Sequence, residues 1–271
     1  MGKNSHIEWT DHTFNPWWGC AKVSPACKHC YAETLANRFG GAIWGVRGER
    51  RVFGEAHWNE PLKWNAEAAK AKTRSRVFCA SMSDVYEDRR DLDAERLKLW
   101  ALIAKTPSLD WLLLTKRPEH AQKLSPWGND WPDNVWLGTS VENQEWADKR
   151  LPVILAIPAK IRFLSCEPLL GPLDIGHFTK KKGIHWIIAG GESGPGSRPM
   201  HPDWVRGLRD LAKKQNIAFH FKQWGNYAPA PKKTAGQTLF TFPNEEVVMV
   251  SRHKSINGRT LDGRTHDEFP V

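Results

Sequence analysis

Three of the five cysteines lie within eleven residues, in the segment WWGCAKVSPACKHCYAE. Cys20, Cys27 and Cys30 have the spacing C-x6-C-x2-C. Soft thiolates at this density are typical ligands of iron–sulfur clusters and of zinc. Three cysteines are one fewer than a closed four-thiolate site needs, so a [4Fe-4S] cluster bound here would keep one iron open to another ligand. We therefore predict a metal centre at Cys20, Cys27 and Cys30 and favour an iron–sulfur cluster.

A structural zinc site is the alternative interpretation of these cysteines. His29 or a distant residue could supply the fourth ligand, because Cys3His sites bind zinc. Zinc ribbons and knuckles usually pair two ligand doublets, however, and no second C-x2-C or H-x3-H follows in the sequence. Under this alternative the chain would be a nucleic-acid-binding protein. Cys79 and Cys166 lie within predicted strands, and we interpret them as buried, inert side chains.

The composition is that of an ordinary globular protein with a basic balance. Of the 271 residues, 40% are hydrophobic and 25% are charged. The 39 Lys and Arg residues exceed the 30 Asp and Glu residues, which gives a net charge of +9. This excess favours an anionic partner such as a nucleic acid or a nucleotide. The fifteen tryptophans suit either core packing or base stacking.

Cysteine usage and hydropathy predict a cytoplasmic protein with no membrane association. An odd set of cysteines crowded into one segment favours metal chemistry in a reducing compartment over a disulfide framework. The sequence has no apolar run of the length that a membrane span needs, and its first residues, MGKNSHIEWTD, lack the apolar region of a signal peptide.

Short apolar runs alternate with longer helix-like stretches along the chain, which is the pattern of βα units. The predicted strands are residues 6–10, 76–81, 110–115, 134–139, 160–165, 185–189 and 218–222. The predicted helices are residues 30–39, 91–105, 119–124, 143–157 and 202–215. Most of the strands are nearly continuous apolar runs, as in parallel strands that are buried on both faces.

We therefore predict an α/β fold, a partial (β/α) barrel of about six to seven parallel strands. This barrel would span residues 1–225, with an insertion around residues 40–64 that would form a lid or a substrate-facing loop. Residues 226–271 would form a C-terminal extension, read as an appendage with a hairpin around residues 238–250.

Polar or glycine-rich residues follow six of the predicted strands, in the segments SMSD, TKRP, TSVEN, SCEPL, GGESG and KQWG. In a (β/α) barrel, ligands and catalytic groups gather at the carboxyl ends of the strands. The segments therefore predict one convergent site. Simple turns would account for the glycines and for Pro118, but less well for Asp84, Lys116, Glu142 and Glu167.

The cysteine motif resembles the signature of the radical S-adenosylmethionine (SAM) superfamily, whose usual spacing is C-x3-C-x2-C. The first gap is longer here. Over residues 6–225 the chain resembles a phage- and prophage-encoded radical-SAM-like family of undetermined function, through IEWTDHTFNPWWGC, SMSD, LLTKRP, LGTSVEN, RFLSCEPLLGP, AGGESG and KQWG. TKRP and the strand order also resemble spore photoproduct lyase, more weakly.

This resemblance implies a metal-binding enzyme in which the three cysteines hold a [4Fe-4S] cluster and S-adenosylmethionine fills the open iron position. The superfamily holds the methionine amino group with a Gly-Gly-Glu element after the second strand, where this chain has Ser81, Ser83 and Asp84. Ser140 and Glu142 would contact the ribose, although a helix cap and a first-turn acid are their plain structural roles. Gly190, Gly191 and Glu192 follow the sixth strand; they are cofactor-binding candidates that we do not equate with that element.

The resemblance also implies cleavage of S-adenosylmethionine to methionine and a 5′-deoxyadenosyl radical, with an electron donor of the flavodoxin or ferredoxin type. Lys116, Glu167 and Lys222 are the catalytic candidates, because they end strands that would face the same site. Arg117 and Trp224 join them for substrate recognition. Basic charge and abundant tryptophan make a nucleic acid or nucleotide the expected substrate, for modification or repair.

Overall fold

The computed structural model describes residues 2–40, 42–180, 183–229, 238–243 and 247–270. Its main sheet has seven strands in the order β1-β4-β5-β6-β7-β8-β9. These strands are β1 (His12–Thr13), β4 (Ser75–Cys79), β5 (Leu109–Thr115), β6 (Val135–Ser140), β7 (Ile161–Cys166), β8 (Trp186–Gly190) and β9 (Ala218–Gln223). The ladders β1–β4, β4–β5, β5–β6, β7–β8 and β8–β9 are parallel. The predicted fold class is confirmed: α/β, with the parallel strands of a partial (β/α) barrel.

Six of the seven predicted strands lie within two residues of the observed ones, but the first is wrong. Residues 6–10 form a turn in which the Thr10 amide donates to the Ile7 carbonyl at 3.1 Å. The Thr10 hydroxyl donates to the Arg76 carbonyl and accepts from the Phe78 amide, both at 3.0 Å. Because this side chain takes the hydrogen bonds that a strand backbone would make, the sheet begins only at His12.

The five predicted helices are present, and the structure adds others. The helices are α1 (Tyr31–Arg38), α2 (Glu55–Trp58), α3 (Glu60–Ala71), α4 (Asp93–Lys105), α5 (Ala121–Leu124), α6 (Gln144–Ala156), α7 (Gly176–Thr179), α8 (Pro202–Gln215) and α9 (Lys254–Asn257). The predicted insertion around residues 40–64 includes α2 and runs into α3. Pro61 in the first turn of α3, with Trp64 and Ala68 buried one turn apart, makes that segment an amphipathic helix.

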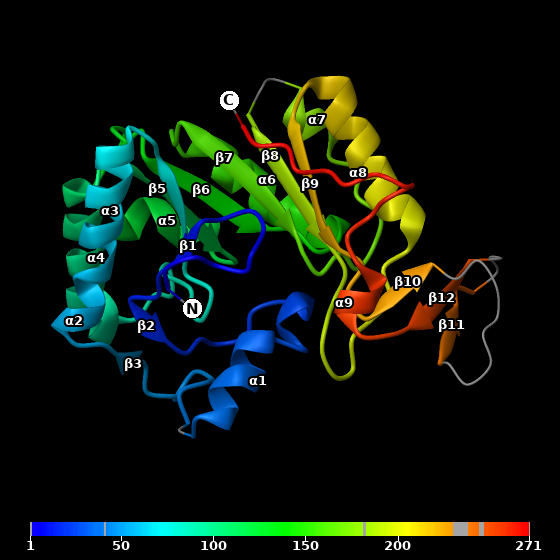
Figure 1. Ribbon diagram of the computed structural model, residues 1–271, viewed down its shortest axis with the longest axis horizontal. Helices are drawn as coiled ribbons and strands as arrows, with labels where there is room; N and C mark the ends of the chain where they lie inside the picture. The colour runs from blue at the N-terminus through cyan, green and yellow to red at the C-terminus, as the bar shows by residue number, and fades with distance from the viewer. Residues whose placement is uncertain (1, 41, 181–182, 230–237, 244–246, 271) are drawn as a thin grey trace. The chain divides into compact units, whose positions relative to one another are not determined.

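The chain divides into two compact units. Unit 1 comprises Met1–Ser24, Ala32–Thr139 and Val153–Arg162. Within it, α3 and α4 lie side by side, and α3 packs against β4 and β5 (Figure 1). Phe14 and Trp111 are fully buried in its core and meet edge to face, with ring centroids 5.7 Å apart.

Unit 2 comprises Pro25–Tyr31, Ser140–Pro152 and Phe163–Val271. Within it, α8 packs on β8 and β9. A second, antiparallel sheet has the order β10 (Tyr227–Pro229), β12 (Val248–Ser251) and β11 (Leu239–Thr241). The predicted hairpin is the β11–β12 pair, and residues 244–246 lie outside the described part of the chain. The predicted domain division at residue 225 stays a prediction.

The last residues of the chain return to the parallel sheet within unit 2. The Phe221 amide donates to the His266 carbonyl at 3.0 Å, and Phe269 packs against Trp186. The end of the chain therefore contributes to the packing of β8 and β9. Among the described residues, no helix is both long and apolar enough to cross a membrane.

Replacement of Lys72 by glycine is expected to stabilise unit 1. Lys72 ends α3 in the left-handed conformation, with φ 55° and ψ 37°, where its Cβ is strained and glycine is the usual residue. We expect Lys72→Gly to raise the free energy of unfolding by about 1 kcal/mol in urea titrations. Lys70→Gly, inside the same helix, is the matched control and should lower it by about 1 kcal/mol. A change of the same sign in the free energy of unfolding of both variants would contradict this explanation.

Candidate functional site

Cys20 lies beside a buried ion pair in unit 1. The Arg117 guanidinium lies 3.6 Å from the Cys20 sulfur and 3.1 Å from the Asp84 carboxylate. It also donates a 2.7 Å hydrogen bond to the Ala21 carbonyl. Arg117 follows β5 and Asp84 follows β4, so residues at the carboxyl ends of two parallel strands hold this half of the cysteine segment.

Asp84 accepts hydrogen bonds from four donors. Its two oxygens accept from the Tyr86 amide at 3.0 Å, the Thr115 hydroxyl at 2.7 Å, the Lys116 amide at 2.9 Å and Arg117. A carboxylate has about four lone-pair sites, so these donors fill them. Asp84 therefore joins the residues after β4 to the end of β5 and fixes Arg117 next to the cysteine.

The Cys20 thiol is protonated at neutral pH in the metal-free chain. Burial raises its pKa to about 12, and the negative charge of Asp84 acts in the same direction. The positive charge of Arg117 and its hydrogen bond to the sulfur lower the pKa, but less than burial raises it.

A second buried ion pair holds the other half of the cysteine segment in unit 2. The Glu142 carboxylate is fully buried and lies 2.8 Å from the Arg150 guanidinium. Its other oxygen accepts from the Ala26 amide at 3.4 Å. Arg150 also donates to the Ser140 carbonyl at 2.9 Å. The residues that follow β6 therefore contact the segment immediately before Cys27.

A third pair, Glu192–Arg198, holds the same segment from the end of β8. Both the backbone amide and the Nε of Arg198 donate to one Glu192 oxygen at 2.8 Å, and the guanidinium also donates to the Pro25 carbonyl at 3.1 Å. Gly196 lies so close to His29 that a Cβ at this position would approach the imidazole to 2.8 Å. The segment after β8 thus packs on the cysteine segment within unit 2.

None of the five cysteines forms a disulfide, and Cys20, Cys27 and Cys30 are partly exposed, whereas Cys79 and Cys166 are buried. Cys20 belongs to unit 1, and Cys27 and Cys30 belong to unit 2. Among the described residues, no three His, Cys, Asp or Glu side chains form a group that could hold a metal ion. As donors, three cysteine thiols suit an iron–sulfur cluster and also zinc.

Glu167 and Lys222 come together in unit 2. Lys222 lies 2.8 Å from one Glu167 oxygen, and the side-chain amide of Gln223 donates to the other at 3.2 Å. Gly190 lies against the same carboxylate, since a Cβ there would come within 3.3 Å of it. The ends of β7, β8 and β9 therefore meet at a partly exposed ion pair. Lys116, the third catalytic candidate, lies in unit 1, and its backbone amide is bound to Asp84.

The other cofactor-binding candidates differ in what their polar atoms contact. Ser81 accepts a hydrogen bond from Asn15 at 3.1 Å. In the part of the chain that the structure describes, the buried hydroxyls of Ser83 and Ser140 lack a hydrogen-bond partner. Gly191 packs so closely that a Cβ would come within 1.9 Å of the Trp224 carbonyl oxygen, so backbone packing requires this glycine.

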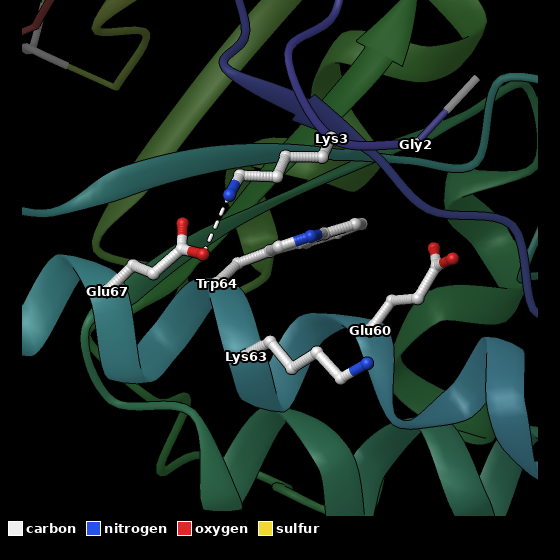
Figure 2. Close-up of a pocket in the computed structure, with 6 residues that line it drawn as sticks. All are labelled: Gly2, Lys3, Glu60, Lys63, Trp64 and Glu67. Atoms are coloured by element: carbon white, nitrogen blue, oxygen red, sulfur yellow. Dashed lines mark hydrogen bonds and ion pairs between the residues drawn. The ribbon is translucent and has the colours of Figure 1, made fainter.

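A pocket in unit 1 lies between the N-terminal segment and α3 (Figure 2). Trp64 lies in it, stacked on His12 at 4.6 Å, and the Lys3–Glu67 ion pair spans one side at 2.7 Å. None of the predicted site residues lines this pocket. We therefore assign it no role in the candidate site.

Comparison with known proteins places the chain in a family. The model of the family described as "Protein of unknown function (DUF5131)" matches residues 4–270. The chain belongs to this family. No protein among the curated ones matches it. A solved structure of a cysteine-to-serine mutant of spore photoproduct lyase is similar, with 12% identity and a TM-score of 0.46, over 93% of this chain and 71% of the other. That similarity is too distant to transfer an activity.

Two arginines of this DUF5131 member were not singled out from the sequence. Arg150 lies in the middle of α6 and Arg198 lies in a segment between β8 and α8, and both resemble solvent-exposed basic residues in the sequence. The sequence feature that points to these arginines is the presence of their partners, Glu142 and Glu192. Both acids follow buried strands, and a buried carboxylate needs a counter-charge. The predicted roles of the site residues stay predictions.

The Glu142–Arg150 pair gives a stability prediction. Arg150→Met leaves the fully buried Glu142 carboxylate without its counter-charge and is expected to lower the free energy of unfolding by about 3–5 kcal/mol. The double variant Glu142→Leu/Arg150→Met removes both charges and should lose less than Arg150→Met alone. Urea unfolding followed by circular dichroism measures both. A double variant less stable than the single one would contradict a desolvation origin.

Proposed function

We propose that this protein is a radical S-adenosylmethionine enzyme whose [4Fe-4S] cluster is bound by Cys20, Cys27 and Cys30. Besides the cysteine motif, one structural observation supports this proposal. In each unit, residues that follow parallel strands hold the cysteine segment, through Arg117 in unit 1 and through Glu142 in unit 2. This edge of the strands is where (β/α) barrels carry their active sites.

The chemistry of the donor set fits this cofactor, since three partly exposed thiols would leave one iron position of the cluster open. Such a cluster, when bound, supplies the electron that cleaves S-adenosylmethionine to methionine and a 5′-deoxyadenosyl radical. An electron donor of the flavodoxin or ferredoxin type would reduce it, which suits the reducing cytoplasm. The buried Ser83 and Ser140 hydroxyls are available to bind the cofactor. Ser81, Gly190 and Gly191 are the other residues that we propose to bind the cofactor.

We propose that the substrate is a nucleic acid or nucleotide, although the abundance of tryptophan supports this less than the sequence suggests. Nine of the fifteen tryptophans are buried, so core packing accounts for most of them. The net charge of +9 remains in favour of an anionic substrate. Trp18 is partly exposed, with the Arg51 guanidinium 5.4 Å from its ring centroid, and such an aromatic–arginine pair suits base stacking.

Anaerobic reconstitution with iron and sulfide tests the cofactor. We expect the wild-type chain to gain the broad visible absorbance of an iron–sulfur cluster and, after dithionite reduction, to produce 5′-deoxyadenosine from S-adenosylmethionine. Single serine replacements of Cys20, Cys27 and Cys30 should each abolish this product. Cys166→Ala, a buried cysteine outside the motif, is the control and should retain it. Stoichiometric zinc without 5′-deoxyadenosine would instead support the structural zinc site.

Lys222 gives a prediction for the substrate step. Lys222→Met removes the partly exposed ammonium beside Glu167 and should lower product formation on nucleic acid by about 100-fold, the usual scale for one acid–base group. Iron content and 5′-deoxyadenosine formation without substrate should stay at the wild-type level. Mass spectrometry of nucleosides from treated nucleic acid measures the product, with Lys214→Met, an exposed lysine of α8, as control. Equal product from both variants would remove Lys222 from the site.

A further inference from the structure

We propose that Trp18, Phe39 and Arg51 form a surface of unit 1 on which unpaired bases stack, so that the substrate is a single-stranded nucleic acid. This inference rests on the proposed nucleic acid substrate, which it narrows to one class. It does not depend on the cluster. All three residues belong to unit 1.

Two short strands place Arg51 next to aromatic rings. The strands β2 (Trp17–Trp18) and β3 (Arg51–Val52) form a two-stranded antiparallel sheet (Figure 1). Trp18 is directly opposite Arg51 in this pair, so their side chains lie on the same face. The Arg51 guanidinium lies 5.4 Å from the ring centroid of Trp18 and 5.6 Å from that of Phe53. The backbone pairing therefore fixes the arginine beside both rings.

A row of aromatic rings connects Trp18 to the core of unit 1. Phe14 is fully buried and stacks on the His57 imidazole, with ring centroids 4.7 Å apart and 13° between the planes. Phe53 contacts the same imidazole at 4.5 Å, and Trp18 lies 5.8 Å from Phe53. The His57 Nε2 donates to the Asn15 carbonyl at 2.9 Å. Because these contacts order the rings without a ligand, stacking on them costs little side-chain entropy.

The outer end of this row is exposed to solvent. Trp18 is partly exposed, and Phe39, whose ring centroid lies 6.0 Å from that of Trp18, is 64% exposed. Val52, next to Arg51 in β3, is 52% exposed. Exposed apolar side chains that lie together are typical of a binding surface. Two of these side chains are aromatic, which suits a flat, unsaturated ligand.

The charges of the same segment favour an anionic ligand. Residues 38–57 include four arginines and two glutamates. Arg50 is buried and pairs with Glu87 at 2.6 Å, so three arginines remain against the two glutamates. Arg51 is exposed and forms no ion pair with any other residue that the structure describes. A guanidinium both neutralises phosphate and stacks on aromatic rings, so this surface fits a nucleic acid better than an apolar peptide.

Stacking on these rings requires a base whose faces are accessible. In a duplex each base is stacked between its neighbours, and a side chain reaches its face only after the base is unstacked. Bases of a single strand are accessible and stack on aromatic side chains with little sequence preference. Trp18 and Phe39 are two adjacent rings, which suit successive bases of one strand, whereas a free nucleotide offers one base.

Binding of a labelled oligothymidylate of about 12 nucleotides to the full chain, measured by fluorescence anisotropy at fixed salt, tests this surface. Phe39→Ala removes an exposed ring and should raise the Kd about tenfold, the usual scale for one base–aromatic stack. Arg51→Gln should raise the Kd by a similar factor. Leu97→Ala, at another exposed apolar residue of unit 1, and Arg90→Gln, at another exposed arginine, are the matched controls and should leave the Kd unchanged. Wild-type affinity in both Phe39→Ala and Arg51→Gln would overturn the inference.

Phe39→Leu and Phe39→Trp separate stacking from simple hydrophobic contact. Leucine keeps an apolar side chain but has no aromatic face, so Phe39→Leu should weaken binding as Phe39→Ala does. Phe39→Trp keeps the ring and should bind at least as tightly as the wild type. Circular dichroism checks that each variant is folded. Wild-type affinity in Phe39→Leu would overturn stacking, and so would a wild-type dimer that Phe39→Ala dissociates, because a second copy of the chain would then cover this surface.

Two further ligands test the preference for a single strand. Oligothymidylate paired with its complement, and thymidine monophosphate, should each bind about tenfold more weakly than the single strand, because the first has stacked bases and the second has one base. Equal affinity for the duplex or for the free nucleotide would overturn the assignment to a single-stranded nucleic acid.

The binding surface and the radical chemistry can fail separately. A wild type that binds the single strand through Phe39 but forms no 5′-deoxyadenosine overturns the proposed radical chemistry and leaves the surface in place. A wild type that forms 5′-deoxyadenosine, but whose affinity for the single strand is independent of Phe39 and Arg51, overturns the surface and leaves the radical chemistry in place.

Discussion

A buried carboxylate needs a counter-charge and a full set of hydrogen-bond donors, and this requirement organises the candidate site. Glu142 is fully buried, and Arg150, on α6, supplies its counter-charge. Because the acid follows β6 and also accepts from the Ala26 amide, one desolvated charge ties a strand end, a helix and the cysteine segment together within unit 2. In unit 1, Asp84 and Arg117 link β4, β5 and the other half of that segment in the same way.

The parallel strands could be predicted because burial on both faces leaves a continuous apolar run, and β5 and β8 are such runs. The first strand could not, because one hydroxyl, that of Thr10, replaces the backbone hydrogen bonds of residues with strand-like side chains. Helix α3 was not predicted, because the tryptophan- and glycine-rich sequence of residues 40–64 suggests a loop that reaches into it, while the spacing of its buried residues Trp64 and Ala68 is helical.

The candidate site was predictable only in part. The spacing of neighbouring residues reveals the cysteine motif, but it does not reveal which side chains pair with buried charges. Cys20, Cys27 and Cys30 are close in sequence, so their pattern is readable. The Arg198 contact with Pro25 joins residues 173 positions apart, and no local pattern encodes it. The carboxylates at strand ends stand out in the sequence, and their convergence on one site stays a prediction. In the structure, Glu142 pairs with Arg150 and accepts a hydrogen bond from the Ala26 amide.

The contacts of the cysteine segment with Arg117, Glu142 and Arg198 affect how much the long gap between Cys20 and Cys27 disfavours cluster binding. In a free peptide, a longer gap between ligands costs closure entropy, which grows slowly with length but includes every backbone dihedral that must be fixed. In this chain three residues of the gap are held by hydrogen bonds: Ala21 to Arg117, Pro25 to Arg198 and Ala26 to Glu142. These hydrogen bonds offset part of the entropy cost of ordering the gap. A departure from the usual spacing therefore argues against cluster binding only where the extra residues lack such anchors.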